Sequence, residues 1–499
     1  MGEYLSFPVL LLAASLATVG CIELSPLPDH PDGSADGDTD SDADTDTDSD
    51  ADDPYQWHTF FGSDARDHAY GAAVIDDGVF VTGESEDSWT GPLDEEPYNP
   101  HSGGSSDIVV MKTDLDGMFG WHAFYGSGGT DNYGRAIDGF DADLYVVGDS
   151  AGSWIGQSSQ QPLNPHSGDS DVFVLKLSRE GEYHWHTFLG SSVMDSGLAV
   201  IAQGDGVLVA GVSENGWNGP ADQAPENPHS GSFDVFVAFL NGDGAYQWHT
   251  FFHKGGVHDP FVGIAEDVGG IYVSAIARSE CNGPGDQPPV NGFHDSTDVL
   301  VFMLDESGQY VWHNYLGSND FQHPYAIAAK ETNVFVTGGS YDIWNGPGGQ
   351  SPLDGSDIDN GAFVMALSSS GDYEWHSFYG GGEGRSIAVE GDDLFVAARP
   401  NNLWEGPAGE DPLNEYGGTQ EPALLKLSTG GEYEWHSFYG EGVSNPDLGP
   451  SVSVQAGGNE FYLVAPSGDS WNGPAGQQPL NPYANGDDIS IICLVQTGA

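Results

Sequence analysis

Short runs of apolar and aromatic residues, separated by Gly and Asp, fill the chain from residue 55 onward. Four of them are YGRAID from Tyr133, DLYVVGDS from Asp143, DVFVLKL from Asp171 and EYHWHTFLG, which follows a turn at Gly181. Runs of this length and composition, bounded by turn residues, predict β-strands, and no stretch shows helical periodicity over a useful length. The four runs predict one small antiparallel sheet of four strands.

The aromatic run returns along the whole chain with a nearly constant period. Its tryptophans are 64, 64, 63, 64, 63 and 60 residues apart, at Trp57, Trp121, Trp185, Trp248, Trp312, Trp375 and Trp435. A fixed period of this length indicates one supersecondary unit that is repeated. Four-stranded sheets repeated around an axis form a β-propeller, so we expect an all-β fold.

The two ends of the repeat region are offset by one strand. The region begins with an aromatic strand at Tyr55 that has no sheet of its own, and it ends with DISIICLV from Asp488, the third strand of its unit. We therefore predict that residues 55–61 pair with residues 488–495. This pairing closes a ring of seven blades and removes an exposed sheet edge.

The repeat resembles the seven-bladed β-propeller repeat of bacterial surface and secreted proteins. The motifs that carry the resemblance are VFVTG at 334–338, DVFVLKL at 171–177 and YHWHTFLGS at 183–191, and it covers roughly residues 55–497. The resemblance implies the fold and not an activity. Where that family has a Ser/Thr-rich stretch ending in Phe-Pro, this chain has WxGP and a longer loop.

The repeated aromatic residues have a structural and a functional interpretation. A Trp that returns in every blade is expected to pack between blades, and the His beside it to make a local hydrogen bond. The other six tryptophans open the long loop after the second strand and either pin that loop to its blade or form aromatic platforms for a sugar or peptide: Trp89, Trp154, Trp217, Trp344, Trp404 and Trp471.

The fourth unit departs most from the pattern. His253 replaces the Gly that ends the aromatic strand elsewhere, and Cys281 replaces the loop Trp. With His258, Asp259 and His294 nearby in the same unit, these residues are candidate ligands for a divalent transition metal. The alternative is drift in one blade, with Cys281 filling a smaller apolar slot.

The charge balance excludes some partners. The chain has 11 Lys and Arg against 77 Asp and Glu, a formal net charge of −66. Nucleic acid is excluded because binding phosphates needs clustered basic residues. The three cysteines form no CxxC pair, and we expect Cys281 and Cys493 to be free thiols.

Residues 1–53 precede the repeats. Residues 7–19 form an apolar run too short to span a membrane, which is typical of a signal peptide over residues 1–20. The following Cys21 resembles the lipidated cysteine of bacterial lipoproteins, although Thr18 stands where that family has Leu and the start lacks Lys or Arg. An ordinary signal peptide is the alternative. Residues 21–53 are Asp-rich and are expected to form a disordered tether or, as the alternative, to bind calcium.

The function inferred from the sequence is binding or display. Residues 54–499 form the propeller, and we expect an exported protein at the outer surface or in the periplasm, or otherwise secreted, that touches membrane only through a lipid on Cys21. Its partner would be an extracellular protein or glycan. No catalytic motif is found, which favours a non-enzymatic role. The alternatives are a hydrolase or lyase of extracellular polysaccharide and a passive structural surface protein.

Overall fold

The computed structural model describes residues 54–495 except 254–260, 356–360, 419–420, 441–450 and 455–458. The chain divides into two units, Met1–Ser49 and Asp50–Ala499. Every described residue belongs to the second unit. Within the described residues, no helix is both long and apolar enough to cross a membrane.

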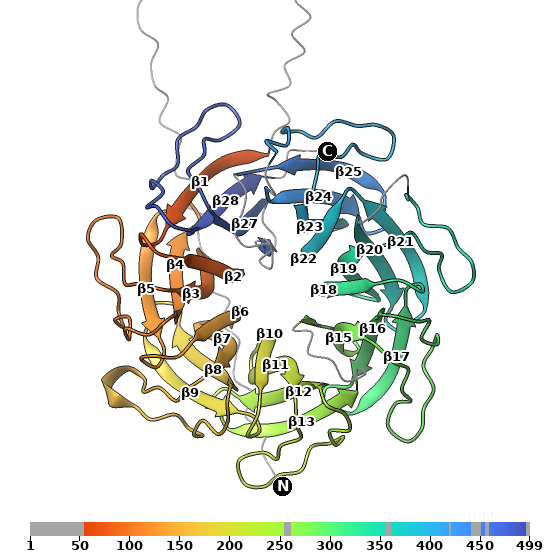
Figure 1. Cartoon of the computed structure of the whole chain (residues 1–499), viewed down its shortest axis with the longest axis horizontal. Coiled ribbons are helices and arrows are strands. Elements are labelled where there is room, and N and C mark those ends of the chain that lie inside the picture. The colour runs from red at the N-terminus through yellow and green to blue at the C-terminus, as the bar shows by residue number, and fades with distance from the viewer. Residues whose placement is uncertain are drawn as a thin grey trace, which may run out of the picture. The chain divides into compact units, whose positions relative to one another are not determined.

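Seven four-stranded antiparallel sheets form a ring (Figure 1), so the predicted seven-bladed β-propeller is confirmed. The first three blades are β2–β5 (Asp67–Ile75, Gly78–Ser85, Asp107–Asp114, Phe119–Tyr125), β6–β9 (Asn132–Phe140, Asp143–Ser150, Asp171–Ser178, Tyr183–Leu189) and β10–β13 (Asp195–Gln203, Gly206–Ser213, Asp234–Asn241, Tyr246–His253). A 3₁₀ turn, η2 (Gln157–Ser159), lies in the long loop of blade 2.

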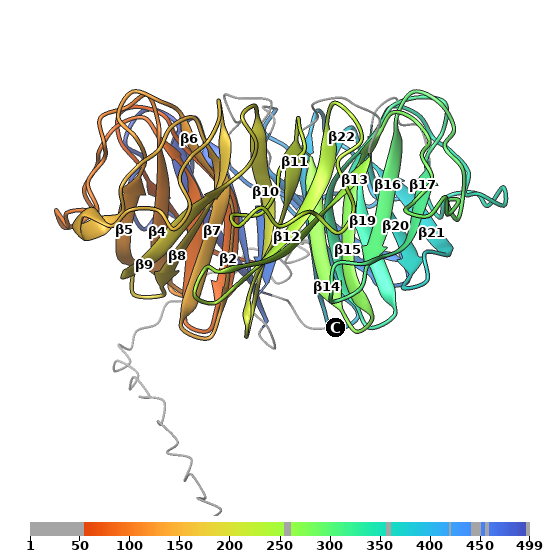
Figure 2. The same cartoon turned by 90° about the horizontal axis from the view of Figure 1, so that it is seen from below.

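The other four blades follow the same order of strands. They are β14–β17 (Val262–Asp267, Gly270–Ala277, Asp298–Leu304, Tyr310–Leu316), β18–β21 (Gln322–Lys330, Asn333–Ser340, Gly361–Ser368, Tyr373–Tyr379), β22–β25 (Gly382–Glu390, Asp393–Pro400, Ala423–Ser428, Tyr433–Phe438) and β26–β28 with β1 (Ser451–Val454, Glu460–Ser467, Asp488–Val495, Tyr55–Phe61). The first strand of each blade is innermost, and seen from the side the blades stand around the ring axis (Figure 2).

The ring closes as the offset ends predict. β1 pairs antiparallel with β28, with Trp57 opposite Cys493 and Phe61 opposite Ile489. The first strand of the propeller in the sequence is thus the outermost strand of its last blade. No sheet edge is left open at the seam, and the prediction of closure is confirmed.

The hydrophobic core lies between the blades. Each of seven buried clusters spans one junction between neighbouring sheets. Middle strands such as β3 and β11 are buried along their whole length because both of their faces are covered. This is why these strands read as continuous apolar runs and not as an alternating pattern.

The strand tryptophans fill these junctions. The ring of Trp121 lies against Gly181, in the turn between the third and fourth strands of the next blade, and its Nε1 donates to the Arg179 carbonyl at 3.0 Å. Gly181 has φ +80°, and a Cβ there would lie 2.9 Å from the indole. The same turn glycine meets the preceding blade's Trp at Gly117, Gly244, Gly308, Gly371 and Gly431. The prediction that this Trp packs between blades is confirmed.

Candidate functional site: the central cavity

The histidine beside the strand Trp makes two local hydrogen bonds in every blade except blade 1, where Nδ1 of His122 has no partner among the described residues. In blade 2, Nε2 of His186 lies 3.3 Å from the carbonyl of Trp154, and Nδ1 lies 2.7 Å from the Tyr183 hydroxyl. A carbonyl only accepts, so Nε2 carries the proton and Nδ1 accepts from the tyrosine. Burial lowers the pKa of His186 to about 4, although the hydrogen bond to Trp154 opposes the shift. The predicted local role of these histidines is confirmed.

Each loop tryptophan stacks on the histidine of its own blade. The ring centroids of Trp154 and His186 are 3.7 Å apart and 9° from parallel, and the same stack holds for Trp89, Trp217, Trp344, Trp404 and Trp471. All six are buried except Trp404, which is partly exposed. Rings held in this way have little open face for a ligand, so the geometry is that of the pinning interpretation and not of exposed platforms.

The long loops cover the outer edge of the ring. In blade 2 the amide of Leu163 donates to the His186 carbonyl at 2.9 Å, and the amide of Phe188 donates to Asn164. Equivalent bonds occur in the other blades, and the loops lie along the rim in Figure 1. A free edge strand is a template for aggregation, so the loop and its tryptophan protect an edge that would otherwise be exposed.

Blade 4 keeps these loop hydrogen bonds but has Cys281 at the position of the loop Trp. Sγ of Cys281 lies 3.1 Å from the Tyr315 hydroxyl, and His313 Nε2 lies 3.0 Å from the Cys281 carbonyl. Nδ1 of His294 lies 3.1 Å from Asp298. Both described candidate metal ligands therefore contact other partners. As expected, neither Cys281 nor Cys493 forms a disulfide within the part of the chain that the structure describes.

The remaining predicted site residues lie outside the described part of the chain. These are Cys21, His258, Asp259 and the side chain of His253, whose backbone ends β13 opposite Asp234. Among the residues that the structure describes, no group of three or more metal-ligating side chains gathers. The metal site, the lipidation and the Asp-rich tether therefore stay predictions.

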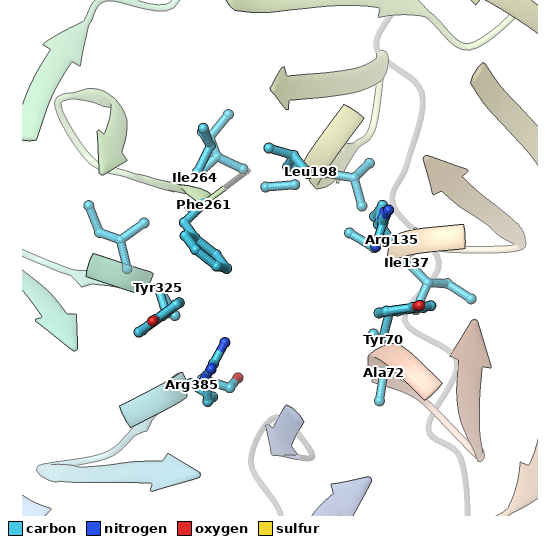
Figure 3. A pocket seen from close by; sticks show the side chains of 18 of the residues that line it. Tyr70, Ala72, Arg135, Ile137, Leu198, Phe261, Ile264, Tyr325 and Arg385 are labelled. Atoms are coloured by element: carbon cyan, nitrogen blue, oxygen red, sulfur yellow. The ribbon is translucent and has the colours of Figure 1, made fainter. Parts of the chain in front are cut away.

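The innermost strands form the wall of a central cavity of about 760 Å³. Five of these strands carry a β-bulge at the same place, and the bulged residues are Tyr70, Arg135, Leu198, Tyr325 and Arg385. A bulge re-aims a side chain and is frequent beside functional sites. All five bulged residues line the cavity, and Phe261 of blade 4 joins them (Figure 3).

One wall is built around Arg135. Its guanidinium carbon lies 4.9 Å from the ring centre of Tyr70 and 4.5 Å from that of Tyr133, and its Nε donates to Asp149 at 2.9 Å. Although burial opposes the charge, Asp149 raises the pKa of Arg135. Two aromatic faces and a carboxylate thus fix this cation in place.

Beside it, Glu84 is buried in a network of its own. The Tyr70 hydroxyl donates to Glu84 Oε1 at 2.9 Å, and His68 Nδ1 and Arg66 Nε lie 3.3 and 3.5 Å from the same oxygen. Burial acts to raise the pKa of Glu84, but His68, Arg66 and Tyr70 together lower it. The Glu84 carboxyl group is therefore ionised at neutral pH and does not serve as a proton donor.

The facing wall repeats this chemistry with other residues. Arg385 lies 4.1 Å from the ring centre of Tyr325 and 5.9 Å from that of Phe261. Glu383 accepts from Arg385, from Arg399 at 3.1 Å and from the Tyr325 hydroxyl at 3.1 Å. Figure 3 shows Tyr70 and Arg135 on one side of the cavity and Phe261, Tyr325 and Arg385 on the other.

This arrangement can bind, but its groups are not tuned for proton transfer. Glu84 and Glu383 are already engaged by arginines, and burial raises the pKa of Tyr70 and of Tyr325, so both phenols stay protonated. A general acid or base works best with a pKa near the operating pH. The guanidinium edges and aromatic rings are instead typical of a ligand site.

The sequence analysis missed this cavity, although a signal was present. Three of the six arginines in the chain line it, at Arg66, Arg135 and Arg385. Arg135 lies within the run YGRAID, whose pattern predicts a strand and nothing more. In so acidic a chain, a rare cation on the innermost strand of a repeat is the observation that could have located the site.

A comparison with curated proteins links the chain to one relative over about half of its length. No family model matches the chain. Over 243 residues it is 26% identical to the regulatory protein FlaEY of Caulobacter vibrioides, which covers 48% of this chain and 23% of that protein. The chain thus spans about a quarter of the length of that curated relative.

Solved structures share the general architecture. BamB from Moraxella catarrhalis is 11% identical, with a TM-score of 0.38, over 88% of this chain and 99% of that one. The phage phi92 endosialidase is 10% identical, with a TM-score of 0.41, over 90% and 70%. Likenesses this weak carry no argument about ligands. By its own structure, this protein belongs to the class of seven-bladed β-propellers, and its central cavity is lined by aromatic residues and arginines.

Proposed function

We propose that this protein is an exported binding protein whose central cavity holds a small organic ligand. The observation that carries the proposal is the set of five bulged side chains aimed into one cavity by five different blades. Its volume of about 760 Å³ lies within the usual range for small-molecule sites. The residues that repeat in the blades maintain the ring, and those that differ between blades supply the contacts.

Export and anchoring complete the proposal. Residues 1–20 direct export, Cys21 carries lipid, and the acidic segment up to residue 53 holds the propeller away from the membrane at the cell surface or in the periplasm. The mature protein should begin at Cys21, and mass spectrometry of the membrane fraction should find it lipidated. A Cys21→Ser variant should be released into the soluble fraction. A soluble wild-type form with unmodified Cys21 would contradict the anchor.

Ligand binding is tested with a neutral apolar dye, N-phenyl-1-naphthylamine. The wild type should bind one molecule per chain, with increased fluorescence. Leu198→Trp places a bulky ring in the cavity wall and should weaken binding about tenfold or more. Leu93→Trp is the matched control, because Leu93 is 84% exposed in an outer loop. Equal binding by wild type and both variants, or no binding at all, contradicts a cavity site.

A further inference from the structure

The cavity contrasts in charge with the rest of the molecule. The formal net charge of the chain is −66, yet the charged cavity-lining residues are three arginines and one glutamate: Arg66, Arg135, Arg385 and Glu84. An acidic surface of this kind repels anions. The arginines in the cavity therefore offer a binding site to an anion that the rest of the surface would repel.

On the blade 6 wall, two cations share one anion. Oε2 of Glu383 accepts from Nη2 of both Arg385 and Arg399, so Arg385 shares its carboxylate partner with a second cation. Nε of Arg385 is buried and has no hydrogen-bond partner. A buried N–H group without a partner is costly, so an acceptor on a ligand would satisfy a donor that the described protein leaves unpaired.

On the blade 2 wall, Arg135 keeps its outer edge available. Its Nε is bound to Asp149, whereas Nη1 and Nη2 have no protein partner among the described residues. The stacked rings of Tyr70 and Tyr133 fix the plane of the guanidinium. A planar cation held in this way matches the paired oxygens of a carboxylate or sulfonate.

Apolar side chains occupy the cavity wall next to these arginines. In three of the bulged strands, the residue two positions after the bulge is an isoleucine that lines the cavity: Ile137, Ile327 and Ile387. Leu198 and Ile264 extend this apolar surface. The edges of Phe261 and the tyrosines face the same space (Figure 3). Such a wall favours an aromatic or aliphatic body over a heavily hydroxylated one, because hydroxyl groups would lose water without gaining partners.

From these contacts we propose that the ligand is an organic anion with an apolar body, whose carboxylate or sulfonate group is held by Arg385, while Arg135 on the facing wall supplies a second positive charge. This inference rests on the proposed function, since it assigns a chemical class to the ligand of the same cavity. Glu383 and Asp149 hold the two arginines in position, and the tyrosines and isoleucines contact the apolar part. The anionic group supplies the acceptor that Nε of Arg385 lacks.

The test uses two dyes that differ by one sulfonate group. 8-Anilinonaphthalene-1-sulfonate is N-phenyl-1-naphthylamine with a sulfonate added, so the ratio of their dissociation constants measures anion recognition. We expect the wild type to bind the sulfonate at least about tenfold more tightly. Arg385→Leu should lower that preference about tenfold, since a lost charge-assisted hydrogen bond has about this effect, and Arg135→Leu should lower it by less. The preference is a ratio of two dissociation constants, so a change that affects both dyes equally cancels.

Two variants control for charge and folding. Arg179→Leu removes the same charge far from the cavity, where Arg179 pairs with Asp76, and should keep the preference. Arg385→Lys keeps a cation and should retain part of it, and Glu383 keeps Arg399 as a partner in either Arg385 variant. If both dyes bind equally well, or the preference survives both cavity variants, the anion inference is overturned while the cavity site stands. If neither dye binds, the proposed function itself fails.

Discussion

The outermost strands of the seven blades carry nearly the same residues, whereas the large residue at the bulge varies among the five innermost strands that carry one. On the outer strand, Trp and His recur because each blade meets the same two packing problems, a neighbour to contact and an edge to cover. On the inner strand the bulged residue is Tyr in two blades, Arg in two and Leu in one. Repetition marks the residues that maintain the fold, and variation at a fixed position marks the candidate site.

The largest expected effect comes from opening the ring. Deleting residues 54–63 removes β1 and exposes β28, together with the apolar surface that buried Phe60 and Phe61 covered. We expect the melting temperature to fall by about 10 °C or more, measured by circular dichroism. Deleting residues 30–49, which contain no aromatic residue, is the matched control and should leave it unchanged. Equal melting temperatures for both deletions would contradict closure by β1.

A single outer-strand contact should matter more than a single inner one. Trp154→Ala removes a 3% exposed ring that stacks on His186, and we expect a loss of about 3–5 kcal/mol in the free energy of unfolding. Leu198→Ala, at a bulge facing the cavity, should cost about 1 kcal/mol or less because its side chain is already partly exposed. Denaturant unfolding measures both, and the reverse order would break the comparison between the two strands.

The tyrosine three residues before the outer histidine allows a reciprocal test. Tyr183→Phe leaves Nδ1 of His186 buried without a donor, which should cost about 1–3 kcal/mol. Blade 1 already has Phe119 at this position, and Nδ1 of His122 is buried without a partner. Phe119→Tyr should therefore stabilise the protein by about 1 kcal/mol. Chemical denaturation of the two variants should give shifts of opposite sign.

The outer histidines should stay neutral well below their ordinary pKa. Burial lowers the pKa of His58, His186 and His249 to about 4. The unfolded state therefore binds more protons between pH 6.5 and 4, and these groups lose stability as the pH falls through that window. Imidazole NMR shifts should show the Nε2–H tautomer down to about pH 5. A titration midpoint near 6.5 would contradict the buried pair of hydrogen bonds.

Buried aspartates oppose this trend. Burial raises the pKa of Asp67 and Asp195 to about 6 and that of Asp488 to about 7. Their folded state takes up protons before the unfolded state does, so these groups gain stability as the pH falls from that range toward 4. The NMR titration separates the two contributions, whereas a stability curve reports only their sum.

The fold could be predicted in detail because its determinants are local and repeated. The spacing of Trp57 and its six counterparts gave the number of blades, and the position of Tyr55 before any complete sheet gave the closure. The cavity could not be predicted in the same way. Arg135 and Arg385 lie in blades 2 and 6, and they line one cavity only because the ring closes, so no local pattern joins them.

For the long loops, the positions of the key residues could be predicted from the sequence, but their role could not. A tryptophan that pins the loop and a tryptophan that stacks on a ligand would occupy the same position in the sequence, so the sequence alone does not distinguish the two roles. Only the 3.7 Å stack of Trp154 on His186 and the hydrogen bonds along the outer strand distinguish the two. Cys281 is similar, since Tyr315 on another strand reaches it with a hydroxyl where the other blades have Phe.

The β-bulges have a consequence for how this molecule could change over evolutionary time. A bulged residue has no partner opposite it, so its side chain can be exchanged without shifting the register of the strand or disturbing the contacts between blades. The fold therefore offers five positions whose side chains can change while the ring stays the same: Tyr70, Arg135, Leu198, Tyr325 and Arg385. New ligand preferences could arise there one substitution at a time, and the same five positions are the natural place to redesign the ring as a sensor or receptor.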